Sequence, residues 1–141
     1  MLQVLMCRSC GRQLSRLVNL LEESDPLAPT PTIEDQTPPF AEGIALIVSD
    51  EPIRTAIAGD PRPLSVTPQA WMNPNDLLAT VRNSKQRSRL NGCCGLDGCD
   101  GPNQICVCGA EVGIRLSDCW TMNVFVPLPE ATAWTTSGLE Q

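Results

Sequence analysis

The segment from Asn91 to Trp120 reads NGCCGLDGCDGPNQICVCGAEVGIRLSDCW. It contains six of the eight cysteines, and the other two stand near the start of the chain, in Cys7-Arg-Ser-Cys10. Asn-Gly and Asp-Gly steps divide its first half into turns, which can bring neighbouring sulfur atoms toward one centre. We therefore expect the rest of the chain to be organised around a cysteine cluster.

The composition offers little material for an apolar core. A chain of 141 residues has the usual size of one domain, so we expect a single domain over residues 1–141. Only 4% of its residues are aromatic, and thirteen prolines with ten glycines interrupt regular elements. Domains with a small core commonly depend on disulfides or metal ions for additional stability, and the cysteines are the candidates here.

The start of the chain indicates reduced cysteines. MLQVLMCRSC has no basic region before its short apolar run and no small-residue cleavage site, so it lacks the pattern of a secretory signal. No run of about 18 or more apolar residues occurs, which predicts no membrane span. The expectation is a cytoplasmic protein, in which paired cysteines favour metal binding over disulfide bonds.

Two short motifs look like the two knuckles of a zinc site. Cys7-x-x-Cys10-Gly11 can present two sulfurs to one ion, and its glycine tolerates the positive φ that such a turn often needs. The second motif, Cys106-x-Cys108-Gly109, is one residue shorter than usual. Four thiolates predict one tetrahedral zinc site, formed by Cys7, Cys10, Cys106 and Cys108.

Four cysteines remain outside this first site. They could build a second zinc site or replace a ligand of the first one, and the adjacent pair could instead include buried thiols that hold no metal. These residues are Cys93, Cys94, Cys99 and Cys119. The prediction is one or two zinc ions per chain.

The segments CRSCG, GCCGLDGCDGPN, CGAEVG and SDCW resemble a bacterial family of small cysteine-rich proteins whose function is uncharacterised. The resemblance covers roughly residues 1–16 and 72–126. Members look like zinc-ribbon-type proteins whose second knuckle has the form C-x-x-C-G, from which Cys106-Val107-Cys108 departs. The resemblance implies that the cysteines form one constellation, and it implies no activity.

Apolar runs predict short strands. MLQVLM at 1–6 and GIALIVS at 43–49 are typical of strands, and Leu64 to Thr67 can form another. The runs on either side of the turn Ser117-Asp118 predict a hairpin. Residues 14–21 fit either a short helix or an irregular strand.

One short helix and several loops complete the expected fold. The helix begins at Pro74 and has Asn73 as its cap. Five prolines predict an extended acidic loop at 24–42, turn signals predict a loop at 50–63, and residues 128–141 are expected to be a flexible tail. The fold class is therefore predicted as α+β, mostly β and loop-rich, in a small zinc-ribbon-like domain with short antiparallel strands.

The sequence shows no catalytic and no cofactor-binding set. The chain has no histidine, which excludes Ser-His-Asp and Cys-His catalytic sets. Glu111 is the nearest Glu to a proposed ligand, but its place in AEVGIRL is that of an outward-facing strand residue. We expect a non-catalytic, zinc-stabilised binding or adaptor module whose partner is another protein, with Trp120 covering the metal site.

Two alternative functions remain open from the sequence. Two cysteine knuckles can hold iron in a rubredoxin-like electron carrier. A nucleic-acid-binding zinc ribbon is the other alternative, and the basic run RNSKQRSR at 82–89 favours it. The formal net charge of −6 opposes attachment to a phosphate backbone, so nucleic acid is not the expected partner.

Overall fold

The computed structural model describes residues 1–48, 54–57, 60–64, 66 and 68–136. Eleven strands and two single 3₁₀ turns lie in this part of the chain, which contains no α-helix. The strands are β1 (Leu2–Cys7), β2 (Val18–Glu22), β3 (Ile44–Val48), β4 (Arg54–Ile57), β5 (Asp60–Pro63), β6 (Gln69–Met72), β7 (Val81–Asn83), β8 (Gln104–Cys106), β9 (Glu111–Leu116), β10 (Val124–Pro127) and β11 (Thr132–Thr135). The 3₁₀ turns are η1 (Pro74–Asp76) and η2 (Arg87–Arg89).

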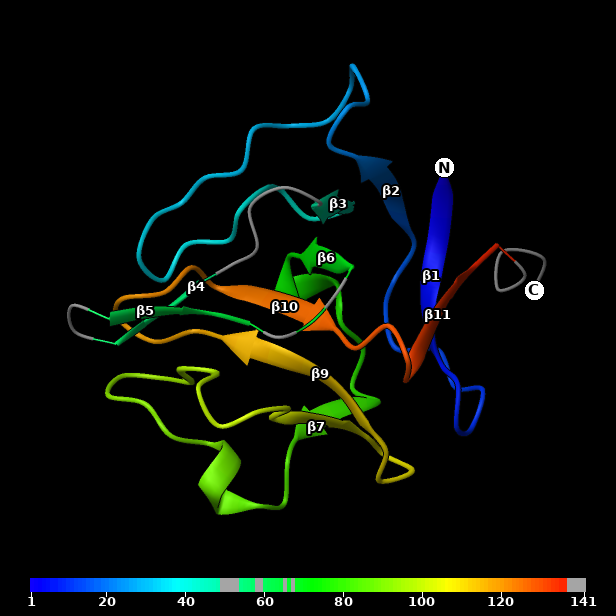
Figure 1. Ribbon diagram of the computed structural model, residues 1–141. Coiled ribbons are helices and arrows are strands. Elements are labelled where there is room, and N and C mark those ends of the chain that lie inside the picture. Colours follow the sequence, from blue (N-terminus) through cyan, green and yellow to red (C-terminus); the bar gives the residue numbers. More distant parts are fainter. Residues whose placement is uncertain (49–53, 58–59, 65, 67, 137–141) are drawn as a thin grey trace.

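Nine of the strands form one sheet in the order β11-β1-β2-β3-β6-β10-β9-β8-β7 (Figure 1). Strands β2 and β3 are parallel, and every other neighbouring pair in this sheet is antiparallel. Strands β4 and β5 form a separate two-stranded sheet, where a loop was expected from the prolines. A strand with only one neighbour tolerates proline because it leaves one row of backbone groups unpaired.

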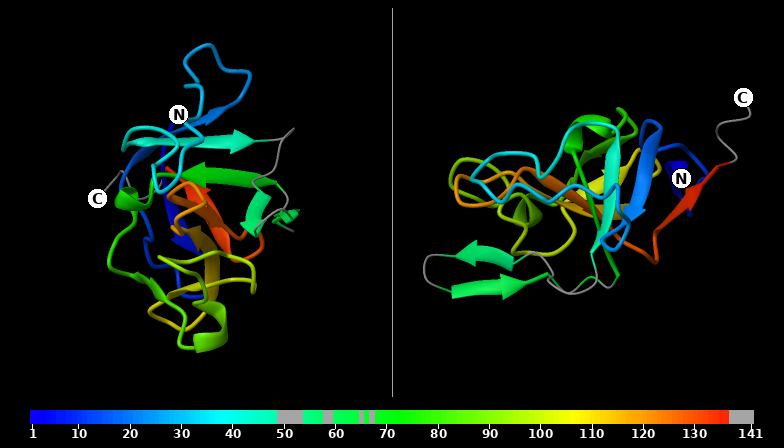
Figure 2. Two further views of the ribbon diagram at one scale, coloured as in Figure 1. Left: turned by 90° about the vertical axis from the view of Figure 1, so that its left-hand side faces the viewer. Right: turned by 90° about the horizontal axis from the view of Figure 1, so that it is seen from above.

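The sheet is strongly curled. In strand order β1 and β8 stand six places apart, which would separate them by about 29 Å in a flat sheet with strands about 4.8 Å apart. The sulfurs of Cys7 and Cys106, at the ends of these two strands, nevertheless lie within 4.8 Å of each other. The sheet therefore bends round into part of a barrel, and Figure 2 gives two further views of it.

This architecture corrects the predicted fold class. The expected α+β zinc ribbon with one helix is wrong, because the chain between the two cysteine knuckles adds paired strands to one large sheet. The knuckles meet because that sheet curls, whereas in the expected ribbon they would meet on a small hairpin scaffold.

Several predicted strands are confirmed. Strand β1 occupies the apolar start, β3 lies within the run predicted at 43–49, and β9 with β10 forms the predicted hairpin, with Leu116 opposite Val124. Of the two alternatives for residues 14–21 the strand is correct, since β2 begins at Val18. Leu64 to Thr67 lies partly outside the described residues, and the nearest strand is β6.

The predicted helix at Pro74 is wrong, although its cap is correct. The Asn73 side chain accepts a hydrogen bond from the N–H of Asn75 at 2.9 Å, but the helix stops after the single turn η1. Leu77 is extended because the chain here pairs with Ser15, and the N–H of Leu78 donates to the carbonyl of Leu14. Tertiary pairing has outweighed the local helix signal.

The inner core lies on the concave face of the sheet, because eight of its nine members come from seven strands that surround it. Alternation along a strand sends every second side chain to this face. The inner core consists of Leu5, Cys7, Leu14, Val18, Ala45, Met72, Cys106, Val112 and Phe125. Two cysteines of the first predicted site therefore end inside the main apolar core.

The outer core covers the other face of the central strands. It consists of Leu21, Phe40, Leu46, Val48, Leu64, Val66, Trp71, Ile114, Leu116, Met122, Val124, Val126 and Leu128. Phe40 belongs to the proline-rich segment 24–42, which contains no strand or helix. That segment is tied to the sheet by the N–H of Gln36, which donates to the carbonyl of Thr121 at 2.7 Å.

The C-terminal segment differs from the flexible tail expected at 128–141. Strand β11 pairs with β1 along four residues, from Val4 opposite Thr135 to Cys7 opposite Thr132. Residues 137–141 lie outside the described part of the chain. Within the described residues no helix has the length and apolar character needed to cross a lipid bilayer.

Replacement of Phe125 by Ala tests the inner core. The Phe125 ring is fully buried and lies so close to Gly113 that a Cβ at Gly113 would stand 2.3 Å from the ring. Phe125→Ala should lower the free energy of unfolding by about 3–5 kcal/mol, measured by urea denaturation of the metal-loaded protein. Leu27→Ala, at a side chain that is 78% exposed, is the control and should change little. A loss below about 1 kcal/mol in Phe125→Ala would contradict this packing.

Candidate metal centre

The first cysteine cluster is built by two similar tight turns. After β1, the N–H of Gly11 donates to the carbonyl of Cys7, and after β8 the N–H of Gly109 donates to the carbonyl of Cys106, both at 2.8 Å. Gly11 and Gly109 have φ values of +76° and +96°, a region that glycine adopts without strain. The second turn closes across three residues instead of four, so the shorter motif still forms a knuckle.

The two knuckles bring together the four cysteines that the sequence assigned to one site. The sulfurs of Cys7, Cys10, Cys106 and Cys108 all lie within 4.8 Å of one another. Cys7 and Cys106 are buried, while Cys10 and Cys108 are exposed. No disulfide bond joins any of the eight cysteines, all of which are described.

The sulfur geometry fits a tetrahedral metal ion. The Sγ atoms of Cys7 and Cys108 are 3.8 Å apart, and those of Cys10 and Cys106 are 3.5 Å apart. Four thiolates at the zinc–sulfur distance of about 2.3 Å would be separated by about 3.8 Å. The donor set and its spacing therefore suit a four-sulfur metal site.

The backbone and the burial act in opposite directions on these thiols. Burial raises the pKa of Cys106 to about 12 and also raises the pKa of Cys7. The N–H of Arg12 has the largest effect on Cys10 and lowers its pKa to about 6. At neutral pH the metal-free cluster thus holds protonated thiols at its buried positions, and a metal must displace their protons.

Metal retention should consequently depend on pH. Protons compete with the metal for the buried thiolates, so the affinity for zinc should rise with pH and fall as the solution becomes acidic. Competition with a chromogenic chelator over a series of pH values measures this dependence. Zinc binding in a weakly buffered solution should also release protons. An affinity independent of pH would contradict thiolate ligation.

The second cysteine cluster contains three of the four remaining cysteines. The sulfurs of Cys93, Cys94 and Cys119 lie within 4.8 Å of one another. Cys93 and Cys94 are exposed and Cys119 is half-buried. Cys99 lies outside this group, and its Sγ is 3.7 Å from the carbonyl oxygen of Asp97. Of the four cysteines outside the first site, three therefore form a second group, and Cys99 does not belong to it.

Asp118 organises this second cluster, a role that the sequence did not indicate. Its carboxylate accepts hydrogen bonds from the backbone N–H groups of Cys93, Cys94 and Cys119 and from the Trp120 indole, at 2.7–3.0 Å. Burial favours the protonated acid, but the backbone donors outweigh it and hold the pKa of Asp118 below its ordinary value. A buried, charged aspartate therefore fixes the backbone of all three cysteines.

Two other candidate residues, Glu111 and Trp120, do not belong to the first cysteine group. Glu111 is exposed on β9, and one of its carboxylate oxygens is 3.6 Å from a guanidinium nitrogen of Arg89. It therefore has the outward position that its sequence context favoured. Trp120 was expected to cover the metal as part of the core, but it is 45% exposed and lies beside Asp118.

No protein-family model, no curated protein and no solved structure matches this chain. The resemblance to a bacterial family of cysteine-rich proteins stays a prediction from the sequence. The described residues contain two cysteine clusters that could hold a metal ion.

Proposed function

We propose that this protein is a non-catalytic module in which one zinc ion, held by Cys7, Cys10, Cys106 and Cys108, stabilises a surface that binds another protein. The observation that carries the proposal is the meeting of four thiols from the two distant ends of a curled sheet. A four-thiolate zinc site is closed, because it leaves no coordination position for water or substrate. Such a site contributes to folding rather than to catalysis.

The first knuckle links the metal to a surface hollow. The N–H of Arg8, next to Cys7, donates to the carbonyl of Ala131, and the Arg8 side chain donates to the carbonyl of Thr132 at 2.7 Å. These bonds hold the start of β11, which carries Trp134. A metal that fixes the knuckle would in this way also fix one wall of the hollow.

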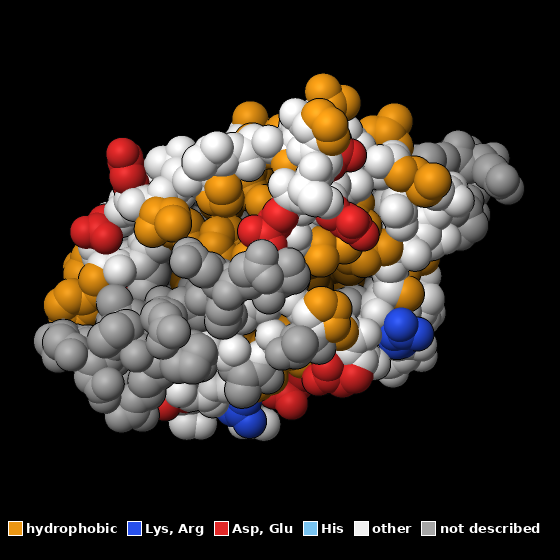
Figure 3. Space-filling model, turned by 45° about the horizontal axis from the view of Figure 1, so that its top comes forward, with side chains coloured by type: hydrophobic (Ala, Val, Ile, Leu, Met, Phe, Trp, Pro, Cys, Tyr) orange, Lys and Arg blue, Asp and Glu red, His pale blue; other side chains and the backbone are white. Residues whose placement is uncertain are grey.

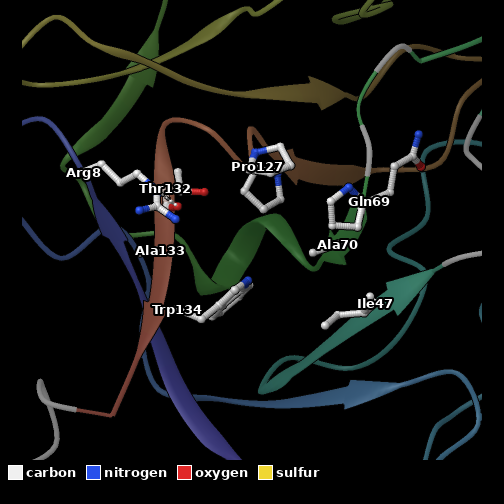
Figure 4. Close-up of a pocket in the computed structure, with 10 residues that line it drawn as sticks. Arg8, Ile47, Gln69, Ala70, Pro127, Thr132, Ala133 and Trp134 are labelled. Carbon is white, nitrogen blue, oxygen red and sulfur yellow. Dashed lines mark hydrogen bonds between the residues drawn. The ribbon is translucent and has the colours of Figure 1, made fainter.

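The hollow has a mainly apolar lining and a volume of about 290 Å³ (Figure 4). Its walls include Ile47, Pro127 and Trp134, and Arg8 lies at one end. This composition suits an apolar side chain of a protein partner, with the Arg8 guanidinium beside it for an acidic group. A protein partner is therefore favoured over nucleic acid.

The charge distribution also supports a protein partner. The chain has 16 acidic and 10 basic residues. On the face shown in Figure 3, carboxylate and hydrophobic side chains lie together, while basic side chains lie near its margin. A negatively charged surface opposes binding to a phosphate backbone.

X-ray absorption spectroscopy tests the metal part of this proposal. Protein purified without added metal, and treated with a mild chelator to remove any zinc at the second cysteine cluster, should contain zinc with sulfur as its ligand at about 2.3 Å. A coloured, iron-containing protein would instead support the rubredoxin-like electron carrier. A first site with an oxygen or nitrogen ligand would contradict the closed structural site.

Site-specific photo-crosslinking tests the partner. A photo-reactive residue in place of Trp134 should form a cross-link to a protein in cells, and one in place of the exposed Leu27 serves as control. Cross-links to nucleic acid from position 134, or equal yields from both positions, would contradict a protein-binding hollow.

A further inference from the structure

The second cysteine cluster has a donor set unlike that of the first. It offers the three sulfurs of Cys93, Cys94 and Cys119, and no fourth sulfur, imidazole or carboxylate of the described residues belongs to the group. Cys99 does not supply the missing ligand, because it lies outside the group. A metal ion bound here would keep one coordination position open.

Asp118 cannot fill that position. A carboxylate has about four lone-pair sites on its two oxygens. One oxygen accepts from the N–H groups of Cys94 and Cys119, and the other accepts from the N–H of Cys93 and the indole of Trp120. All four sites are thus occupied, and Asp118 positions the cysteines without binding the metal itself.

The loop that carries Cys93 and Cys94 is closely packed against the Ser117-Asp118 turn. A Cβ at Gly95 would stand 2.3 Å from the carbonyl oxygen of Ser117, so a side chain there would push the loop away. The N–H of Ser117 donates to the carbonyl of Leu96 at 2.9 Å, and the Ser117 hydroxyl accepts from the N–H of Leu96. The three sulfurs are therefore held together by a loop that is built for this approach.

From this geometry we propose that Cys93, Cys94 and Cys119 form a second, exchangeable site for a thiophilic d¹⁰ metal ion, with Asp118 as its positioning residue. Three thiolates without an oxygen ligand select soft ions such as zinc or copper(I). The open position and the exposure of Cys93 and Cys94 give a chelator or an acceptor protein direct access to the ion. The inference goes beyond the proposed function, because it assigns metal exchange to a site that the structural zinc does not use.

Metal-release kinetics test this proposal. The full chain is loaded with zinc under reducing conditions and mixed with a chromogenic chelator, and the released zinc is followed by absorbance. We expect two zinc ions per chain, one released quickly and one slowly. A single ion that is released slowly, or two ions released at one rate, would overturn the proposal.

Matched cysteine variants assign the fast ion. Cys94→Ser should remove the fast phase and leave the slow phase, whereas Cys99→Ser should keep both phases. A fast phase that persists in Cys94→Ser, or that disappears in Cys99→Ser, would overturn the assignment. A wild-type protein that shows only the fast phase would count against the four-cysteine site and not against the second site. Loading with copper(I) under nitrogen decides which ion the second site prefers.

Asp118→Asn tests the positioning role. The amide replaces one of the two acceptor oxygens by an NH₂ group, so either Cys93 or the pair Cys94 and Cys119 loses its hydrogen bond to this side chain, and the three sulfurs lose their fixed arrangement. We expect the affinity for the fast ion to fall at least about tenfold. The affinity for the slow ion and the circular dichroism spectrum should stay unchanged. Unchanged affinity for the fast ion would overturn this role, and the Cys94→Ser result stands as an independent test if Asp118→Asn does not fold.

Discussion

Complete removal of metal under reducing conditions is expected to abolish the β-sheet circular dichroism signal of this protein. Structural zinc contributes on the order of 10–16 kcal/mol in small zinc peptides near neutral pH. The net stability of an ordinary domain is about 5–15 kcal/mol. Because the contribution of zinc is as large as the whole stability of such a domain, the metal-free chain should be mainly unfolded.

The position of the first site explains why the effect should extend over the whole sheet. Cys10 and Cys106 are 96 residues apart in the chain, and their sulfurs are 3.5 Å apart. The metal therefore closes a long loop and joins strands that are not neighbours in the sheet. Without it, protonated thiols would be left at the end of the inner core.

A mild chelator provides the control for this experiment. It should remove only the rapidly exchanging ion at Cys93, Cys94 and Cys119, and the circular dichroism spectrum should then be unchanged. Addition of zinc to the fully metal-free protein should restore the β-sheet signal. A spectrum that is unchanged after complete removal of metal would contradict the structural role of zinc.

Replacement of Cys106 by Ser is expected to have an effect of similar size. Cys106 is fully buried, and its sulfur is within 4.8 Å of the other three ligands of the first site. Serine removes the thiolate and places a hydroxyl in the inner core, where an unpaired polar group is costly. We expect Cys106→Ser to be mainly unfolded even in excess zinc, by circular dichroism and by urea denaturation.

The same substitution at Cys99 is the matched control for Cys106→Ser. Cys99 is half-buried and lies outside both sulfur groups. Cys99→Ser should therefore retain the zinc of the first site and most of the stability of the wild-type protein. Equal losses in the two variants would show that the cysteines act through packing and not through a metal.

The strands could be predicted from the sequence where the signal is local. The apolar runs at 1–6 and 43–49 contain enough Val, Ile and Leu to specify β1 and β3, and the Ser117-Asp118 turn between two apolar runs specifies the β9–β10 hairpin. The knuckles are local too, because each depends on a cysteine spacing and a following glycine. These elements need no knowledge of the rest of the chain.

The arrangement of the strands could not be predicted because it depends on pairings between distant residues. Strand β1 pairs with β11 near the other end of the chain, and β3 pairs with β6 across a segment that reads as loop. The helix signal at Asn73-Pro74 was real but short, and pairing of Leu77 with Ser15 ended it. Curvature of the sheet, which brings the knuckles together, leaves no mark in the local sequence.

The cysteine sites, too, could be predicted only where the sequence signal is local. Spacing grouped Cys7 and Cys10 with Cys106 and Cys108, but it could not separate Cys99 from the other three cysteines. The role of Asp118 could not be predicted because Ser-Asp is a common turn sequence, and two of its four hydrogen bonds come from a loop more than twenty residues earlier in the chain. The adjacency of Asp118 to Cys119 and Trp120 was the one available signal.

Native mass spectrometry with elemental analysis, on protein purified without added metal, measures whether zinc occupies the four-cysteine site. The wild-type chain should carry zinc in the slowly exchanging first site after mild chelation, at one ion per chain, and Cys106→Ser should carry none there. A wild-type chain that contains no metal, with its eight cysteines oxidised to disulfides, would contradict the claim that zinc holds the two ends of the curled sheet together.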